Sequence, residues 1–401
     1  MLTPADALAR ILEHQAVFPA ESCALAKAHG RVLRADIAAD RDLPPFNRVT
    51  MDGFALRAKS VTKTRRSFRV TAVQAAGMSP VDLGPEPDAC VEIMTGAMLP
   101  EGADCVVPYE ETSRLGDTIT LNPELRVKAG QSVHARGSDF AAGELIVAKG
   151  CRLSAREIAV AASCGCAELS VSRQPKIAVV GTGDELVEVD AVVAPHQVRR
   201  SNDYALRAAL VAAGYPIVER FHLHDMQHEI EHQGWHILAE FDVVILTGGV
   251  SKGKFDYLPG VLESLGVKKV FHGVAQRPGK PFWFGLGERQ VSVFALPGNP
   301  VSAYTCLHRY VLPALDHASR LMVPAPRRVR LAARHVFAAP LACLLPVRLE
   351  DDGAGGQVAR PCPTNTSGDF SGLVGTDGFV ELPADQNEFP AGHLAEFRAW
   401  V

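Results

Sequence analysis

The region from residue 175 to about 320 alternates between short apolar runs and helical patterns, and this alternation restricts the fold more than any other feature. The run KIAVV (176–180) precedes the helical pattern NDYALRAALVAAG, and PIVERFHL (216–223) precedes MQHEIEHQGWHILAE. FDVVILT (241–247) is followed by a third helical pattern, DYLPGVLESLG. Continuous apolar strands that alternate with helices are typical of parallel sheets covered on both faces. The sequence therefore predicts a mostly parallel, doubly wound sheet.

The rest of the sequence divides into regions with other patterns. A length of 401 residues exceeds one ordinary hydrophobic core. Helical patterns stop and resume around a segment of short β-like runs, and alternating strands return after residue 325. We predict a multidomain α/β and β chain with a discontinuous helical domain over 1–50 and 139–173, an inserted β-rich domain over 51–138, the α/β domain over 174–320, and a small barrel-like β domain over 325–401.

Composition excludes several classes of protein. The net charge is −4, from 41 basic and 45 acidic residues, which predicts no nucleic-acid partner. No apolar run reaches the roughly 18 residues that span a bilayer, so we expect no membrane segment. The start MLTPADALARILEHQ predicts a helix with Thr3 as N-cap and Pro4 in its first turn, not a signal peptide. Nine scattered cysteines favour reduced thiols and a cytoplasmic location.

Polar, glycine-rich loops follow four strands of the predicted sheet: GTGDEL, HLHD, TGGVSKGKFD and LPGNPVSA. Ligands of open parallel sheets bind at the carboxyl ends of the strands. We therefore expect these loops to form one pocket. GTGDEL does not fit a dinucleotide site, because Leu186 replaces the third glycine and Asp184 and Glu185 would repel a pyrophosphate.

The loop TGGVSKGKFD has the residues of an anion site. Gly248 and Gly249 allow backbone N–H groups to approach an anion, and Ser251 adds a donor. The segment RPGKP supplies two further cations, Arg277 and Lys280. Together these residues favour a phosphate-bearing ligand over ordinary surface charge.

Carboxylates in the same loops favour a magnesium ion beside that ligand. Asp225 and Asp256 are the expected ligands, with Glu185 nearby. The alternative for Asp256 is a helix cap alone, and Asn299 has the same alternative. His228 and His232 lie away from the apolar stripe of their helix, so we expect them to face solvent instead of binding zinc.

Eight ordered blocks together resemble the molybdopterin molybdenumtransferase family, which includes MoeA and the E-domain of gephyrin. The blocks are PPFNRVTMDGFALR, IMTGAMLPEGADCVV, GQSVHARGSDFAAGE, GTGDEL, RSNDYAL, TGGVSKGKFDY, RPGKPFWFG and LPGNPVSA. The sequence departs from the family pattern at Asn47, Arg48, Val49, Lys254 and Arg277.

The resemblance implies a transferase of molybdenum cofactor biosynthesis, with an α/β domain of the molybdopterin-binding type. It would take adenylyl-molybdopterin and molybdate, use Mg²⁺ and release AMP. The implied catalytic residues are Asp52, Asp139, Glu185, Asp225, Asp256 and Lys280, of which Asp225 and Asp256 would bind the metal. The implied substrate-binding residues are Thr95, Arg136, Gly248, Gly249, Ser251, Arg277, Asn299 and Ser371. For Asp52, Arg136 and Asp139 the residues alone also fit plain turns.

The family resemblance also implies an elongated homodimer, in which Asp52 and Asp139 reach the site of the partner subunit. A molybdopterin adenylyltransferase is a possible further partner. Three alternatives remain open from the sequence: that the chain is itself an adenylyltransferase, that it is a scaffold protein, or that it takes tungstate in place of molybdate. The chain is long for an adenylyltransferase, and no disordered linker indicates a scaffold.

Overall fold

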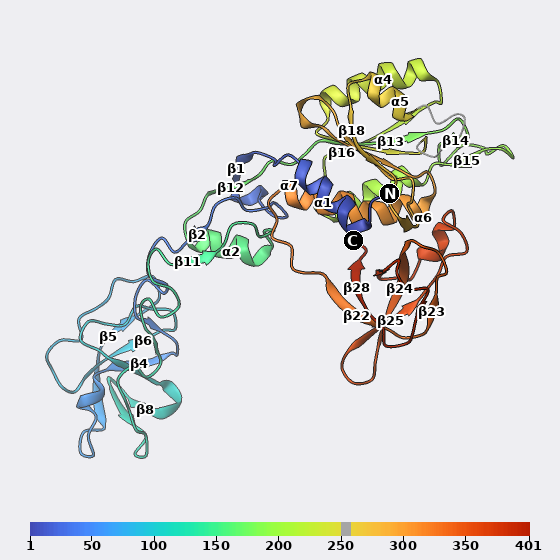
Figure 1. The fold of residues 1–401 in the computed structure, drawn as a ribbon. Coiled ribbons are helices and arrows are strands. Elements are labelled where there is room, and N and C mark those ends of the chain that lie inside the picture. Colours follow the sequence, from blue (N-terminus) through green and yellow to red (C-terminus); the bar gives the residue numbers. More distant parts are fainter. Residues whose placement is uncertain (250–257) are drawn as a thin grey trace. The chain divides into compact units, whose positions relative to one another are not determined.

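The computed structural model describes residues 1–249 and 258–401. The chain forms two units (Figure 1). Unit 1 comprises Met1–Arg34, Gly150–Ser154 and Leu169–Val401, and unit 2 comprises Ala35–Lys149 and Ala155–Glu168. Within the described ranges, no helix has the length and apolar character needed to cross a bilayer.

The α/β part of unit 1 contains a six-stranded sheet with the order β16-β13-β17-β21-β20-β18. Its strands are β13 (Ile177–Thr182), β16 (Val218–Leu223), β17 (Val243–Thr247), β18 (Lys268–His272), β20 (Trp283–Leu286) and β21 (Ser292–Leu296). The first four strands in this order pair in parallel, and β20 pairs antiparallel with both β21 and β18, so β20 alone runs against the other five. This confirms the predicted mostly parallel sheet.

Helices cover both faces of this sheet, as Figure 1 shows. Side chains of β13 alternate between the two cores: Ile177 and Val179 pack with α1, α3, α6 and α7, and Ala178 and Val180 pack with α4 and α5. Both faces of the central strands are apolar because both are buried. The α-helices are α1 (Pro4–His14), α3 (Asn202–Ala212), α4 (Gln227–Glu240), α5 (Leu258–Ser264), α6 (Pro300–Cys306) and α7 (Leu312–Ala318).

The N-terminal helix α1 begins as the sequence predicts. The Thr3 hydroxyl accepts a hydrogen bond from the Asp6 N–H at 3.1 Å, and Pro4 occupies the first turn. Ala7 and Ile11 of this helix lie in the core on one face of the α/β sheet. Residues 1–34 therefore belong to unit 1, which differs from the helical domain predicted over 1–50. The apolar side of α1 accounts for the difference, because it is buried against the sheet's helices.

The helical stretch over residues 300–318 has three segments. A π-helical segment, η5 (Leu307–Val311), separates α6 from α7. Pro313 follows it and cannot donate a backbone hydrogen bond to the preceding turn. The widened turn accommodates this missing donor, and single π turns are frequent at functional sites.

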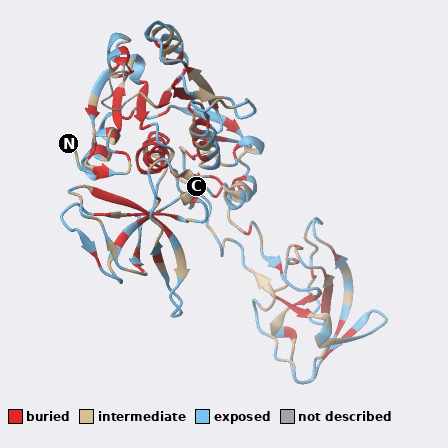
Figure 2. Cartoon of the chain, turned by 90° about the vertical axis from the view of Figure 1, so that its right-hand side faces the viewer, coloured by how far each residue is buried: buried red, intermediate tan, exposed pale blue. Residues whose placement is uncertain are grey.

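The C-terminal part of unit 1 is a closed sheet. The order is β19-β24-β25-β22-β28-β26, and β26 pairs back with β24. The strands are β19 (Gln276–Arg277), β22 (Arg327–Leu331), β24 (Ala342–Asp351), β25 (Gln357–Pro361), β26 (Gly378–Leu382) and β28 (Leu394–Ala399). Buried residues of these strands form the core of the barrel (Figure 2). The segment DDGAGG forms a hairpin turn that joins β24 to β25.

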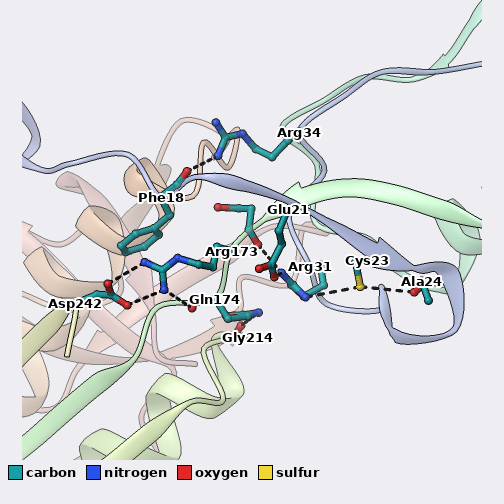
Figure 3. Close-up of polar contacts among 11 residues, drawn as sticks. Phe18, Glu21, Cys23, Ala24, Arg31, Arg34, Arg173, Gln174, Gly214 and Asp242 are labelled. Atoms are coloured by element: carbon teal, nitrogen blue, oxygen red, sulfur yellow. Dashed lines mark hydrogen bonds and ion pairs between the residues drawn. The ribbon is translucent and has the colours of Figure 1, made fainter. Parts of the chain in front are cut away.

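A group of arginines holds the segments that enter the α/β part of unit 1 (Figure 3). The Arg173 guanidinium donates to both carboxylate oxygens of Asp242, at 2.8 and 2.9 Å. Burial opposes ionisation of Asp242, but these bonds and one from the Lys176 N–H hold its pKa below its usual value. The pair ties together the starts of β13 and β17, at the end of the sheet opposite the strand-end loops.

Unit 2 contains a six-stranded sheet with the order β7-β4-β6-β5-β9-β8. Its strands are β4 (Gly53–Leu56), β5 (Ser67–Gln74), β6 (Ala89–Ile93), β7 (Cys105–Pro108), β8 (Thr112–Leu115) and β9 (Thr118–Leu121). Apolar residues fill a core on each face. Shorter elements of this unit are β2 (Ile37–Ala38), β3 (Arg48–Val49), β10 (Val133–His134), β11 (Leu145–Val147) and α2 (Ala155–Ser163).

The remaining elements are short. Two-stranded pairs in unit 1 join β1 (Ala20–Ala24) to β12 (Glu168–Ser172), β14 (Leu186–Val187) to β15 (Val198–Arg199), and β23 (His335–Val336) to β27 (Glu388–Phe389). Single 3-10 turns are η1 (Leu25–Lys27), η2 (Ala58–Ser60), η3 (Tyr109–Glu111), η4 (Glu288–Gln290) and η6 (Phe370–Leu373).

Candidate functional site

A cleft of about 690 Å³ lies at the carboxyl ends of β13, β17 and β21 in unit 1. Its described lining comes from the loops after these strands, the β14–β15 pair, the start of α3 and Gly368 of the C-terminal part. Four predicted site residues line it: Glu185, Gly248, Gly249 and Asn299. The position agrees with the general rule for ligands of parallel sheets.

The glycine turn after β17 fits closely against the loop after β13. Gly248 and Gly249 both have positive φ, of 100° and 64°. A Cβ atom at Gly248 would lie 2.7 Å from the Thr182 carbonyl oxygen, a distance that real Cβ atoms do not adopt. At Gly249 it would lie 3.3 Å from the Thr182 hydroxyl. Both glycines are therefore required by backbone conformation, and the first also by space.

Charged side chains form the floor of the cleft, a name used here for Arg200, Asp203 and Arg220. Arg200 and Asp203 are buried and line the cleft, whereas the Arg220 side chain is 26% exposed and supports Asp203 from β16. Asp203 is 2% exposed and lies in the first turn of α3. Its Oδ2 atom accepts hydrogen bonds from Arg200 at 2.5 Å and Arg220 at 2.9 Å. The Arg220 guanidinium also lies over the Tyr204 ring, 3.6 Å from its centre. The floor fixes the start of α3, whose backbone N–H groups favour an anion.

Asp225, a further predicted acid of unit 1, lies beside the cleft. Asp225 follows β16, and its N–H donates to the Asp184 carboxylate at 3.1 Å. Asp225 does not line the cleft, because β16 is the outer strand and the loop after β13 lies between. This corrects the expectation that all four loops line one pocket. Ser251 and Asp256 lie outside the described residues.

The cationic loop, residues 276–280, lies toward the C-terminal barrel. Arg277 does not line the cleft but a smaller hollow of about 240 Å³, with Val301, Cys343 and Ser367 among its neighbours. The reason is the pairing of β19 with β24, which sets Arg277 opposite Cys343. Lys280 is exposed and precedes Pro281, a lining residue of the cleft. The loop therefore borders both cavities.

Two further predicted residues, Asn299 and Ser371, make hydrogen bonds to residues of the C-terminal part of unit 1. The Asn299 amide donates to the Ser367 hydroxyl at 2.8 Å, so it does not act only as a helix cap. Ser371 is exposed, and its hydroxyl donates to Asp369 at 2.7 Å. Asn299 thus connects the cleft to the barrel, whereas Ser371 does not line the cleft.

In unit 2 two predicted residues meet. The Asp52 carboxylate accepts a hydrogen bond from the Thr95 N–H at 2.6 Å. Hydrogen bonds from the backbone and side chain of Thr95 hold the pKa of Asp52 below its usual value. An exposed carboxylate held in this way stays ionised at neutral pH and is available to a ligand.

The other two predicted residues of unit 2 have different partners. Asp139 contacts the His134 ring at 2.8 Å, and the other ring nitrogen lies 3.1 Å from the Arg48 guanidinium. The pairing of β3 with β10 sets Arg48 opposite His134. Arg136 donates to Asp42 at 2.8 Å. The hydrogen bond from the Ala142 N–H, and then that from Arg136, lower the pKa of Asp42. That Asp52 and Asp139 serve a partner subunit stays a prediction.

The histidines of α4 are exposed, as the sequence predicts. Among residues 1–249 and 258–401, no three His, Cys, Asp or Glu side chains group in a way that would hold a metal ion. All nine cysteines are free thiols.

Sequence reasoning missed the floor of the cleft. Arg200 and Asp203 belong to RSND, which the sequence indicates only as the start of a helix. Two arginines near an aspartate look like surface charge in a sequence. Only the burial of Asp203 against β16 shows that they form a supporting group.

Three family models cover nearly the whole chain. The model of the MoeA N-terminal region (domain I and II) matches residues 2–165, that of a probable molybdopterin binding domain matches 178–317, and that of the MoeA C-terminal region (domain IV) matches 328–400.

Relatives match over the full length. A molybdopterin molybdenumtransferase of Synechocystis is 40% identical over 402 residues, which cover 100% of both chains. One from Staphylococcus aureus is 31% identical over 98% of this chain and 94% of its own. The crystal structure of a molybdopterin biosynthesis protein, moeA, from Pyrococcus horikoshii has a TM-score of 0.83 at 30% identity, covering 100% of this chain and 99% of that one. The chain therefore belongs to the molybdopterin molybdenumtransferase family.

Proposed function

We propose that the chain is a molybdopterin molybdenumtransferase, which inserts molybdenum from molybdate into adenylyl-molybdopterin and releases AMP. One observation carries the proposal. The polar cleft lies at the carboxyl ends of parallel strands in a chain that is 40% identical, end to end, to a protein of that name. Its volume of about 690 Å³ suits a ligand of nucleotide size.

The residues of the cleft would act on the phosphate groups of this substrate. The Gly248 N–H donates to the Leu296 carbonyl oxygen, so the Gly249 N–H and the start of α3 would supply the backbone N–H groups that stabilise negative charge on phosphate oxygens. The exposed Glu185 carboxylate stands at the same edge and can orient water or a hydroxyl group. Arg277 and Lys280 would hold the molybdate oxyanion beside the cleft.

Magnesium is part of the proposal. The described acids at this edge are of the kind that Mg²⁺ prefers, and the Asp184 carboxylate reaches the backbone of Asp225. Mg²⁺ commonly takes one or two carboxylates and keeps several waters, so a group of three protein ligands is not required. Asp225 and Asp256 would hold the ion, which when bound neutralises charge on the phosphate oxygens. Glu185 and the glycine turn position the substrate independently of it.

Other features of the family complete the proposal. We infer a cytoplasmic homodimer in which Asp52 and Asp139 complete the site of the partner subunit. The adenylyl-molybdopterin would come from a molybdopterin adenylyltransferase. Molybdate and tungstate have nearly the same size and charge, so competition between the two oxyanions decides which is preferred.

The test uses purified protein with adenylyl-molybdopterin, molybdate and Mg²⁺. We expect AMP release that depends on molybdate, and a product that activates an apo-molybdoenzyme. A parallel reaction contains molybdopterin and ATP instead. Consumption of ATP there, without AMP release in the first reaction, would show an adenylyltransferase and contradict the proposal.

A further inference from the structure

The cationic loop is held by both parts of unit 1. Its first two residues form β19, in which Gln276 pairs with Ala342 and Arg277 with Cys343 of the barrel. Its end leads into Phe282, which is fully buried in the α/β core. The Gln276 side chain points the other way, into the interior, where it is 0% exposed.

The Gln276 amide uses its donors and its acceptor in this interior. Its oxygen accepts a hydrogen bond from the Tyr310 hydroxyl. Its nitrogen donates to the Pro278 carbonyl oxygen at 3.1 Å and contacts the Cys306 sulfur at 3.6 Å. Tyr310 and Cys306 are also 0% exposed. A buried amide with these partners fixes the backbone that it bonds, here at the middle of the loop.

The backbone of the loop at Gly279 also packs against Cys306 and Gln276, without spare room. Gly279 has a φ of 91°, and a Cβ atom there would lie 2.5 Å from the Cys306 sulfur. It would also lie 2.7 Å from the Gln276 amide nitrogen. The backbone between Arg277 and Lys280 is therefore in direct contact with the end of α6. Tyr310 lies one turn further on, in the π-helical segment η5.

We propose that Gln276 and Tyr310 are positioning residues, which set the spacing of Arg277 and Lys280 for a tetrahedral oxyanion. The inference rests on the proposed function, because it takes molybdate as the oxyanion. A leucine at position 276 would fill the same interior but would leave the Tyr310 hydroxyl and the Pro278 carbonyl oxygen without this partner. The amide therefore both satisfies the buried hydroxyl and, through its bond to the Pro278 carbonyl, selects one path of the loop.

The experiment compares Gln276→Leu, Tyr310→Phe and the double variant with the wild type. Molybdate affinity is measured by titration calorimetry, and AMP release gives KM for molybdate and kcat. We expect each single change to weaken molybdate binding about three- to tenfold and to raise KM by the same factor, with kcat changed less. The loss of molybdate affinity in the double variant should be smaller than the product of the two single losses, because both changes remove the same Tyr310–Gln276 hydrogen bond.

Gln15→Leu is the matched control. The Ser292 hydroxyl donates to the Gln15 amide oxygen at 2.9 Å, so this is also a buried hydroxyl–glutamine pair. Ser292 begins β21, at the end of the strand away from the cleft. We expect this control to lower thermal stability as Gln276→Leu does and to leave molybdate affinity unchanged. Lys280→Ala provides the reference for loss of a cation of the loop.

The outcomes separate the inference from the proposed function. Unchanged molybdate affinity in both single variants, with a loss of stability like that of the control, would overturn the inference. A wild type that binds no molybdate would overturn it too. A wild type that binds molybdate but releases no AMP would overturn the proposed function alone, since the affinities of the variants still decide the role of Gln276. Tyr310→Phe removes only a hydroxyl group, which keeps the test informative if Gln276→Leu fails to fold.

Discussion

The rim and the floor of the cleft in unit 1 are built from different kinds of residue. The rim consists of strand-end loops with an exposed acid, Glu185, and two glycines, Gly248 and Gly249. The floor consists of two arginines around Asp203, which is 2% exposed. Groups that meet a ligand must be accessible, whereas groups that shape the cleft can be buried. We therefore expect changes in the floor to affect stability, and changes in the rim to affect activity.

The floor should show the largest loss of stability. Asp203→Asn leaves Arg200 and Arg220 without the carboxylate between them, and loss of one member of a buried ion group costs about 3–5 kcal/mol. Urea unfolding, followed by tryptophan fluorescence, measures this loss of unfolding free energy, because all three tryptophans belong to unit 1.

Asp242→Asn is the control for this change, because the Asp242 and Arg173 side chains are 30% and 35% exposed. We expect a loss of about 1 kcal/mol or less there. Equal losses in the two variants would contradict the distinction between a buried floor and a partly exposed ion pair.

A second buried support is His308, which lies in η5 and is 5% exposed. Its Nε2 accepts from the Val401 N–H at 3.2 Å and its Nδ1 donates to the Tyr304 carbonyl at 2.9 Å, as a neutral ring requires. Burial lowers the pKa of His308 to about 4 from 6.5. As the pH falls, His308 is therefore protonated in the unfolded chain before it is protonated in the folded chain. The free energy of unfolding falls as the pH drops from 6.5 toward 4.

The shift of His308 corresponds to on the order of 3 kcal/mol over this range, at roughly 1.4 kcal/mol per pKa unit. His308→Gln cannot titrate, so its unfolding free energy should fall less steeply between these pH values. Parallel pH curves for the wild type and this variant would show that His308 is not the group responsible.

The rim should respond in activity. Gly248→Ala places a methyl group 2.7 Å from the Thr182 carbonyl, so the turn must move. A displacement of about 1 Å at a reacting site can reduce activity about a hundredfold. AMP release and urea unfolding are measured together, and we expect the first to change far more than the second.

Gly260→Ala in α5 is the matched control, since a Cβ atom there meets nothing within 4 Å. It should keep full activity and gain up to about 1 kcal/mol of stability. A Gly248→Ala variant with the activity of this control would refute the role of the glycine turn.

The same contrast explains what could be predicted from the sequence. The rim follows from local patterns: the sheet, its parallel order and the loops at its edge all come from apolar runs and glycines that lie close together in the chain. The floor does not, because Arg220 joins Asp203 across 17 residues and only the packing of α3 on β16 buries Asp203. Charge in a sequence does not reveal burial.

The cationic loop shows the same limit at longer range. The sequence places both cations of this loop with the strand-end loops, but it does not indicate the separate hollow that Arg277 lines. That position depends on the pairing of β19 with β24, whose partners are more than 60 residues apart along the chain. The hydrogen bond from Tyr310 to Gln276 joins residues 34 positions apart, and nothing in RPGKP indicates it.

Asp52 of unit 2 resembles the rim in being an exposed acid, and its change should have the smallest effect on stability. Asp52→Asn keeps an oxygen to accept from the Thr95 N–H but removes the charge. We expect an unchanged unfolding midpoint and AMP release reduced about ten- to a hundredfold, as for loss of a charged group at a reacting site. Circular dichroism on heating and the AMP assay measure the two quantities.

Asp117→Asn, in the exposed turn between β8 and β9, is the control and should change neither quantity. Because Thr95 lowers the pKa of Asp52 below 3.8, Asp52 is ionised throughout an assay range above pH 5. Any loss of wild-type activity on the acid side of that range must come from another group, and the pH profile of Asp52→Asn should keep the same shape at a lower level. An Asp52→Asn variant that is fully active would show that the charge of Asp52 has a different role from the one inferred. A pH–activity profile of this variant that no longer falls at low pH would show the same.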